Sequence, residues 1–144
     1  MTAPFIRRSD GTTLQGRVVR AGHEWSLTLR LCDLTWIVID HRVSLRFDDA
    51  VVTIEGPFVL RSGGGAVDLD PGDRATLGPL LAVYPDTLTH GSVSSSGVLT
   101  LRFLSGATIE VPSSRNYEAW QVEGPGDYLV VCSPGSEGAL SVWP

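Results

Sequence analysis

Two arginines occupy equivalent places in a phrase that the chain repeats. VSLRFDDAVVTIEGP recurs later as LTLRFLSGATIEVP, so that Arg46 corresponds to Arg102. Long side chains on neighbouring antiparallel strands can reach each other diagonally, which brings Glu55 and Glu110 within range of these arginines. Two interpretations stay open. One is a pair of surface ion pairs worth about 0–1 kcal/mol each, and the other is a guanidinium pair that binds a carboxylate or an acidic partner.

A second set of candidate contact residues lies in SSRNY at 113–117, which interrupts the later copy of the repeat. Where a duplicate departs from its twin, symmetry no longer accounts for the residues, and loops on a rigid scaffold often carry binding. We therefore expect Arg115, Asn116 and Tyr117, together with Trp120, to contact a partner. The alternative for the two aromatic side chains is burial with a hydrogen-bonded polar tip.

Catalytic, metal and nucleotide motifs are absent from the sequence. The three histidines (His23, His41 and His90) show neither a two-histidine helical spacing nor a Cys/His cluster. No GxSxG elbow occurs, and the SGGG at 62–65 lacks the Lys-Ser/Thr ending of a phosphate loop, so that a plain turn is expected there. We expect no catalytic residue, no metal and no cofactor.

Charge and composition exclude two classes of partner. The 144 residues carry a formal net charge of −5 and include no lysine, so that no basic face is available for nucleic acid or for an anionic membrane surface. The segment MTAPFIRRSDG has no apolar region typical of a secretion signal, and the run WIVI is too short to cross a bilayer. Cys32 and Cys132 lie in apolar runs and are expected to be buried thiols. These features predict a cytoplasmic protein that is a monomer or a homodimer.

Each repeated phrase is predicted to form a β-hairpin, because apolar residues alternate along it with a period of two. In the first hairpin we expect residues 48–51 in the loop, with Leu45 opposite Ile54. In the second we expect residues 104–106 in the loop, with Leu101 opposite Ile109 and Gly106 at a left-handed position.

The repeat extends beyond the hairpins and predicts the architecture. Units at about 34–72 and 88–135 each hold several strands, and residues 1–32 form an N-terminal extension to a single domain spanning 1–144. Two such units are expected to pair into an all-β sandwich or a partly open barrel. Between them, Asp73 is a predicted N-cap of a short helical connection, in which Gly78-Pro79 prevents a long helix. The N-terminal extension is expected to contain a hairpin near Asp10-Gly11 and a strand at 25–31.

From about residue 34 to 144 the chain resembles an actinobacterial family of small all-β domains of unknown function. The matching phrases are VSLRFDDAVVTIEGPF, LTLRFLSGATIEVP, NYEAWQVEGPG and LVVCSPGSEGALSVW. The resemblance implies a small cytoplasmic all-β protein and provides no catalytic residues.

The sequence therefore favours a non-enzymatic module that recognises a protein partner, for which an immunity-type protein that neutralises a toxin is one suitable form. Two alternatives stay open: a β-barrel that holds a small ligand, and an enzyme whose site has no sequence signal. A large internal apolar pocket would favour the ligand-binding barrel. A filled core with an exposed aromatic and arginine patch would favour protein recognition.

Overall fold

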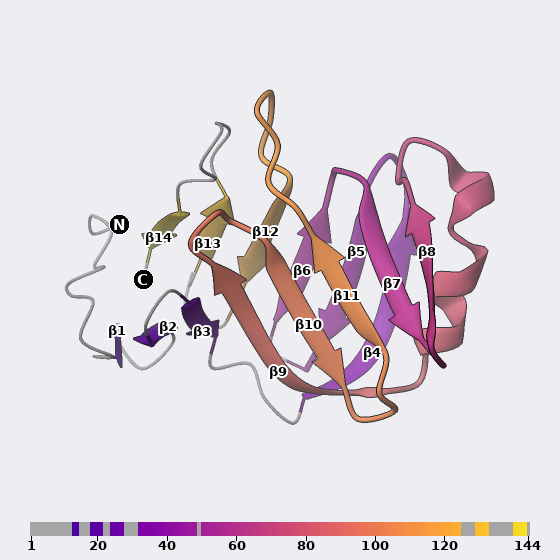
Figure 1. Cartoon of the computed structure of the whole chain (residues 1–144), viewed down its shortest axis with the longest axis horizontal. Coiled ribbons are helices and arrows are strands. Elements are labelled where there is room, and N and C mark those ends of the chain that lie inside the picture. The colour runs from indigo at the N-terminus through magenta and orange to yellow at the C-terminus, as the bar shows by residue number, and fades with distance from the viewer. Residues whose placement is uncertain are drawn as a thin grey trace.

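The computed structural model consists almost wholly of antiparallel strands (Figure 1). It describes residues 13–14, 18–21, 24–27, 32–48, 50–124, 129–132 and 140–143. The strands in these residues are β1 (Thr13–Leu14), β2 (Val18–Ala21), β3 (Glu24–Leu27), β4 (Cys32–Ile39), β5 (Val43–Phe47), β6 (Val51–Ile54), β7 (Phe58–Ser62), β8 (Gly65–Leu69), β9 (Thr87–Ser94), β10 (Leu99–Phe103), β11 (Thr108–Val111), β12 (Trp120–Glu123), β13 (Leu129–Cys132) and β14 (Leu140–Trp143). Two short 3-10 helices, η1 (Arg74–Thr76) and η2 (Gly78–Val83), connect β8 to β9.

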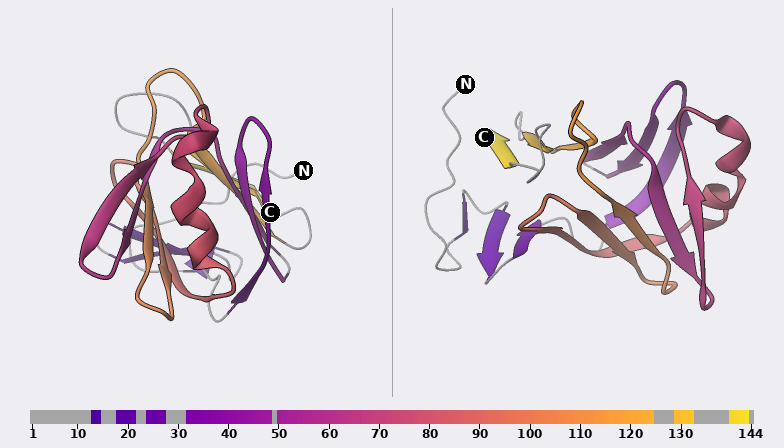
Figure 2. Two further views of the ribbon diagram at one scale, coloured as in Figure 1. Left: turned by 90° about the vertical axis from the view of Figure 1, so that its right-hand side faces the viewer. Right: turned by 45° about the horizontal axis from the view of Figure 1, so that its top comes forward.

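The strands form two layers that are joined along β4. One layer has the order β14-β13-β12-β6-β5-β4 and the other the order β9-β10-β11-β7-β8. β4 pairs with β9 through Cys32 and Asp33, and with β5 from Leu34 to Ile39. Figures 1 and 2 show the two layers facing each other, with η1 and η2 at the side where β4 and β8 end the layers. Because no pairing within the described residues joins β8 to β4, the predicted sandwich or partly open barrel with a helical connection is confirmed.

Within the described residues, a cluster of buried apolar side chains lies between the layers. Phe47 and Phe103, one from each repeated hairpin, are both buried, and their ring centroids lie 6.3 Å apart at an interplanar angle of 26°. Other large buried side chains of this core are Leu45, Ile54, Phe58, Leu80, Leu101 and Trp120. The inward positions of both repeated phrases therefore meet in the middle of the molecule.

The second repeated phrase forms the predicted hairpin. Leu101 pairs with Ile109 and Arg102 with Thr108, and the N–H of Phe103 donates to the carbonyl of Ala107. Gly106 has a φ of +97°, the left-handed conformation in which glycine costs least at the third position of such a loop.

The predicted register of the first hairpin is wrong by two residues. Leu45 pairs with Val52, and not with Ile54, while Arg46 pairs with Val51. The turn is shorter than the predicted loop because the N–H of Phe47 donates to the carbonyl of Ala50, which is itself buried. A shift of two residues leaves every side chain on its predicted face, since the strand period is two.

Each repeat unit contributes a strand to the layer that contains the hairpin of the other unit. β7, which follows the first hairpin in the chain, pairs with β11 of the second hairpin, whereas β12, which follows the second, pairs with β6 of the first. This reciprocal exchange is what two equivalent units would produce. Internal duplication nevertheless stays a prediction, and so does the division of the chain into one domain with an N-terminal extension.

The helical connection begins as the sequence predicts. Asp73 caps η1, its carboxylate accepting a hydrogen bond of 3.2 Å from the N–H of Ala75. Leu77 and Leu80 are buried in the core, whereas Leu81 is exposed. The connection therefore covers the open side of the sandwich with one apolar face and leaves a second apolar surface uncovered.

Part of the N-terminal prediction can be placed. β3 covers the start of the strand expected at 25–31 and pairs with both β2 and β9. The turn expected near Asp10-Gly11 lies outside the described residues. Within the described part of the chain, no helix has the length and hydrophobicity that crossing a membrane requires.

Candidate functional site

The two ion pairs expected at the repeated arginines are not formed. Glu110 pairs with Arg61 of β7, because β7 lies beside β11 and Arg61 is opposite Thr108, which is two residues from Glu110 on the same face of the strand. The guanidinium of Arg46 lies over the indole of Trp36 on β4, at 5.4 Å from its ring centroid. Arg46 is thus held by a cation–π contact, a contact worth about 0.5–1 kcal/mol at an exposed site.

Arg46 and Arg102 lie on opposite outer faces of the sandwich. Each precedes a phenylalanine that points inward, and the two phenylalanines stack on each other across the core. Alternation along a strand therefore directs both arginines outward, away from each other. One small ligand cannot bridge them, although each remains a separate candidate contact residue.

The inserted segment forms a tied loop next to the turn between β9 and β10. The Ser113 hydroxyl donates to the carbonyl of Ser96 (3.1 Å), and the N–H of Asn116 donates to Ser114 Oγ (3.1 Å). Tyr117 covers Gly56, where an added Cβ would lie 3.1 Å from the tyrosine Oη.

The side chains of this loop nevertheless remain accessible. Arg115, Asn116 and Glu118 are exposed, and Tyr117 is 41% exposed. Arg115, Asn116 and Tyr117 therefore stay candidates for contact with a partner.

Trp120 differs from the other predicted contact residues. It is 1% exposed, and its Nε1–H donates to the carbonyl of Gly97 at 2.9 Å. The indole is packed in the core beneath the loop, so that Trp120 stabilises the fold and is not itself exposed to a partner.

The double substitution Arg115→Ala and Tyr117→Ala is expected to change the free energy of unfolding by about 1 kcal/mol or less, because Arg115 is exposed and Tyr117 lies at the surface, 41% exposed. A urea melt of the variant and of the wild-type protein measures this. A loss of several kcal/mol would mean that the loop is a structural clasp and not a contact surface.

Sequence reasoning missed the main apolar surface. Of the eight large hydrophobic side chains exposed within the described residues, five lie on β4 and at η2: Trp36, Val38, Ile39, Leu81 and Tyr84. A register irregularity between Leu34 and Trp36 reverses the alternation, so that Trp36 pairs with Arg46 and Val38 with Ser44. The signal available in the sequence was the run TWIVI itself, since a strand that is apolar on both faces needs a cover on both.

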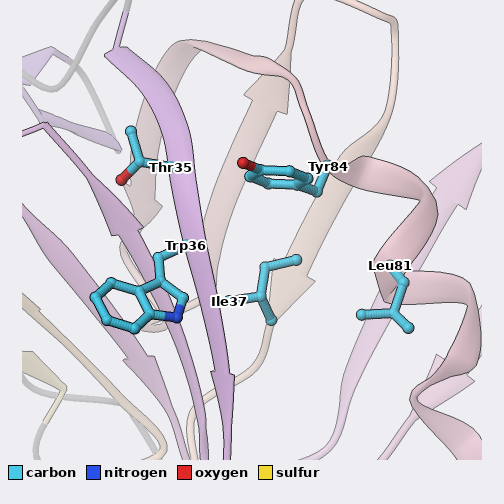
Figure 3. Close-up of a pocket in the computed structure, with 5 residues that line it drawn as sticks. All are labelled: Thr35, Trp36, Ile37, Leu81 and Tyr84. Atoms are coloured by element: carbon cyan, nitrogen blue, oxygen red, sulfur yellow. The ribbon is translucent and has the colours of Figure 1, made fainter.

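A hollow of about 330 Å³ lies between β4 and η2, lined by Thr35, Trp36, Ile37, Leu81 and Tyr84. Figure 3 shows the Trp36 indole on one side of β4, and Ile37 on the other side, facing Leu81 and Tyr84. We call this hollow the β4–η2 groove, and we call Trp36, Val38 and Arg46 the outer patch. The two surfaces meet along one strand, and both are mainly apolar.

Charged groups mark the two ends of the groove. At one end Asp33 accepts a hydrogen bond from the Thr87 hydroxyl (2.7 Å), and Asp86 accepts from the N–H of Thr87 (2.8 Å). At the other end the backbone N–H of Arg42 donates to Asp40 and holds the pKa of that carboxyl below its usual value, with smaller contributions from the charges of His41 and Arg42. The turn 40–42 therefore combines opposite charges, whereas the end near Asp33 is acidic.

None of the groups described so far forms a metal centre. The described residues contain no group of three or more His, Cys, Asp or Glu side chains that could hold an ion.

Comparison with known proteins identifies a family but supplies no activity. A model of a family described as Family of unknown function (DUF6188) matches residues 25–144. The match begins earlier than the resemblance found from sequence phrases and includes all of β3 except its first residue, Glu24. No curated protein and no solved structure matches the chain.

Proposed function

Because the chain belongs to the DUF6188 family, whose function is unknown, we propose from its geometry that it is a non-enzymatic binding module that recognises a protein partner. The observation that carries this proposal is the outer patch, an exposed tryptophan in contact with an arginine. Trp36 is 58% exposed and lies under the guanidinium of Arg46. Tryptophan and arginine are the side chains most enriched among residues that dominate the energy of protein interfaces.

The loop of Arg115, Asn116 and Tyr117 offers a second contact surface of similar composition. An immunity-type protein that neutralises a toxin is one form of this proposal, for which an actinobacterial cytoplasm is the setting implied by the sequence resemblance. The net charge of −5 would speed association with a basic partner, since complementary charge steers diffusional encounter.

A small ligand is the second candidate. The β4–η2 groove has a volume of about 330 Å³ and an apolar lining, at the lower limit of ligand sites of about 300–1,000 Å³. It opens to solvent along the edge of β4, however, and does not enclose a ligand between the layers. Protein recognition is the better-supported function for this reason.

Substituting Trp36 by serine is expected to reduce partner binding in the native host by about tenfold or more, as loss of an interface tryptophan does. Tagged wild-type and variant proteins would be purified after in-cell cross-linking, and each co-purified protein would be quantified by mass spectrometry. A partner recovered with the wild type and depleted with the Trp36→Ser variant supports the proposal.

The matched control is Leu104→Ser. Leu104 is 72% exposed in the turn between β10 and β11, so that the substitution removes an equally accessible apolar group from another surface. Equal depletion by both variants would indicate nonspecific adhesion. Unchanged recovery with Trp36→Ser would contradict the proposal.

A further inference from the structure

Within the part of the chain that the structure describes, one edge of β4 has backbone groups without a strand partner. β9 occupies this edge only at Cys32 and Asp33, and the N–H of Leu34 donates to the carbonyl of Asp86 (2.8 Å). From Thr35 to Ile39, the described residues supply no backbone partner on the side away from β5. Since every second residue of an antiparallel strand directs its N–H and C=O away from its neighbour, this edge can accept another strand.

The edge lacks the devices with which proteins usually protect such strands. Charged residues, proline and glycine discourage pairing, but the sequence TWIVI from Thr35 to Ile39 contains none of them. The edge strand of the other layer, β8, carries Asp68 and begins at Gly65. Of these two edges, β4 is therefore the one suited to accept a strand.

Both faces of an added strand would meet apolar side chains. Its backbone would lie about 4.8 Å from β4. Side chains facing η2 would enter the groove and contact Ile37, Leu81 and Tyr84, while those on the other face would lie beside Trp36 (Figure 3). Main-chain hydrogen bonds give affinity in this mode of recognition, and the side-chain pockets give specificity.

The position of η2 determines which occupant fits. Figure 2 shows η1 and η2 between the edges of the two layers, and in Figure 3 Leu81 and Tyr84 lie on the side of β4 that Ile37 faces. If β4 of a second copy paired here, that copy would bring its whole sheet past η2, which flanks this hollow. A single extended segment adds only one strand beside β4, so the groove suits a segment better than a second sheet.

Charge determines which end of the segment carries basic residues. The strand pairs among the described residues are antiparallel, and in that orientation the carboxyl end of an added segment lies beside Asp33 and Asp86. The opposite end faces the turn of Asp40, His41 and Arg42, where charges of both signs lie together. A segment with basic residues at its carboxyl end is therefore complementary to the groove.

We propose that the β4–η2 groove binds an extended segment of a partner protein by strand addition to β4, with an apolar centre and lysine or arginine at the carboxyl end. This inference rests on the proposed function and specifies the mode of recognition and the chemistry of the partner.

The test uses four synthetic probes. The parent peptide is Ac-Thr-Val-Thr-Val-Thr-Val-Lys-Lys-NH2, and three twins carry a Glu-Glu ending, the Lys-Lys pair at the amino end, or N-methylated central residues. Titration followed by NMR is expected to show saturable binding of the parent, about tenfold weaker binding of the Glu-Glu twin, weaker binding of the twin with Lys-Lys at the amino end, and no binding of the N-methylated twin. The amide signals of Thr35 to Ile39 should shift, while those of Val67 on β8 should not.

An acidic variant and a matched control test the charge argument. Asp33→Asn keeps an acceptor for the Thr87 hydroxyl and is expected to weaken binding of the parent severalfold, whereas Asp68→Asn on β8 should have no effect. Failure of the parent to bind, or equal binding of the N-methylated twin, would overturn strand addition. A concentration-dependent dimer in sedimentation equilibrium that is lost on blocking β4 would overturn the choice of occupant. If Trp36→Ser depletes a cellular partner but the parent peptide does not bind, the proposal of protein recognition stands and strand addition to β4 is rejected.

Discussion

Replacing Trp120 by alanine is expected to lower the free energy of unfolding by about 3–5 kcal/mol, the range for removing a buried tryptophan. The side chain is 1% exposed, and its Nε1–H donates to the carbonyl of Gly97. Alanine would leave a cavity between the layers and would remove the hydrogen bond to the turn between β9 and β10. Because domains of this size are stable by only about 5–15 kcal/mol, the variant should unfold at a much lower urea concentration.

Trp36→Ala is the matched control for this experiment. The same residue type is removed from a site that is 58% exposed, so that the loss should be about 1 kcal/mol or less, mainly from the contact with Arg46. Urea melts followed by far-ultraviolet circular dichroism measure both variants without relying on tryptophan fluorescence. Similar losses for Trp36→Ala and Trp120→Ala would show that the assignment of one indole to the core and the other to the surface is wrong.

The comparison of the two hairpins shows what periodicity can predict. Both phrases alternate cleanly, so that the buried faces were predictable, including Phe47 and Phe103. The exact pairing was predictable only for the second hairpin, where Gly106 specifies the turn. The first hairpin has no such residue between Phe47 and Val51, and alternation alone cannot distinguish registers that differ by two.

The candidate surface was less predictable than the fold. Whether Trp36 faces the core or solvent depends on an irregularity in the pairing of β4 with β5, which residue types do not reveal. The juxtaposition of β4 with Leu81 and Tyr84 arises from the way the helical connection crosses the open side of the sandwich. The loop residues Arg115, Asn116 and Tyr117 could be identified from sequence because an insertion into a repeat is visible without coordinates.

Phe47→Ala is expected to cost about 3–5 kcal/mol, and Phe103→Ala a similar amount, because each ring is buried and each hairpin contributes it to the same contact. Alanine at both positions would cost about 6–10 kcal/mol, an amount comparable to the whole stability of about 5–15 kcal/mol of a domain of this size. The coupling between the rings is therefore measured with leucine, which retains most of the apolar volume and keeps the protein folded.

The double-mutant cycle consists of Phe47→Leu, Phe103→Leu and the double variant. The loss of unfolding free energy in the double variant should differ from the sum of the two single losses by about 0.5–1.5 kcal/mol, the energy of an aromatic pair beyond area burial. Phe58→Leu combined with Phe47→Leu is the control, since Phe58 is equally buried and has no ring contact with Phe47 in the described residues. Additive losses in the first cycle would mean that the hairpins are stabilised separately, each by its own layer. A coupling confined to Phe47 and Phe103 would instead identify their stacking as the contact through which the two repeated hairpins stabilise each other.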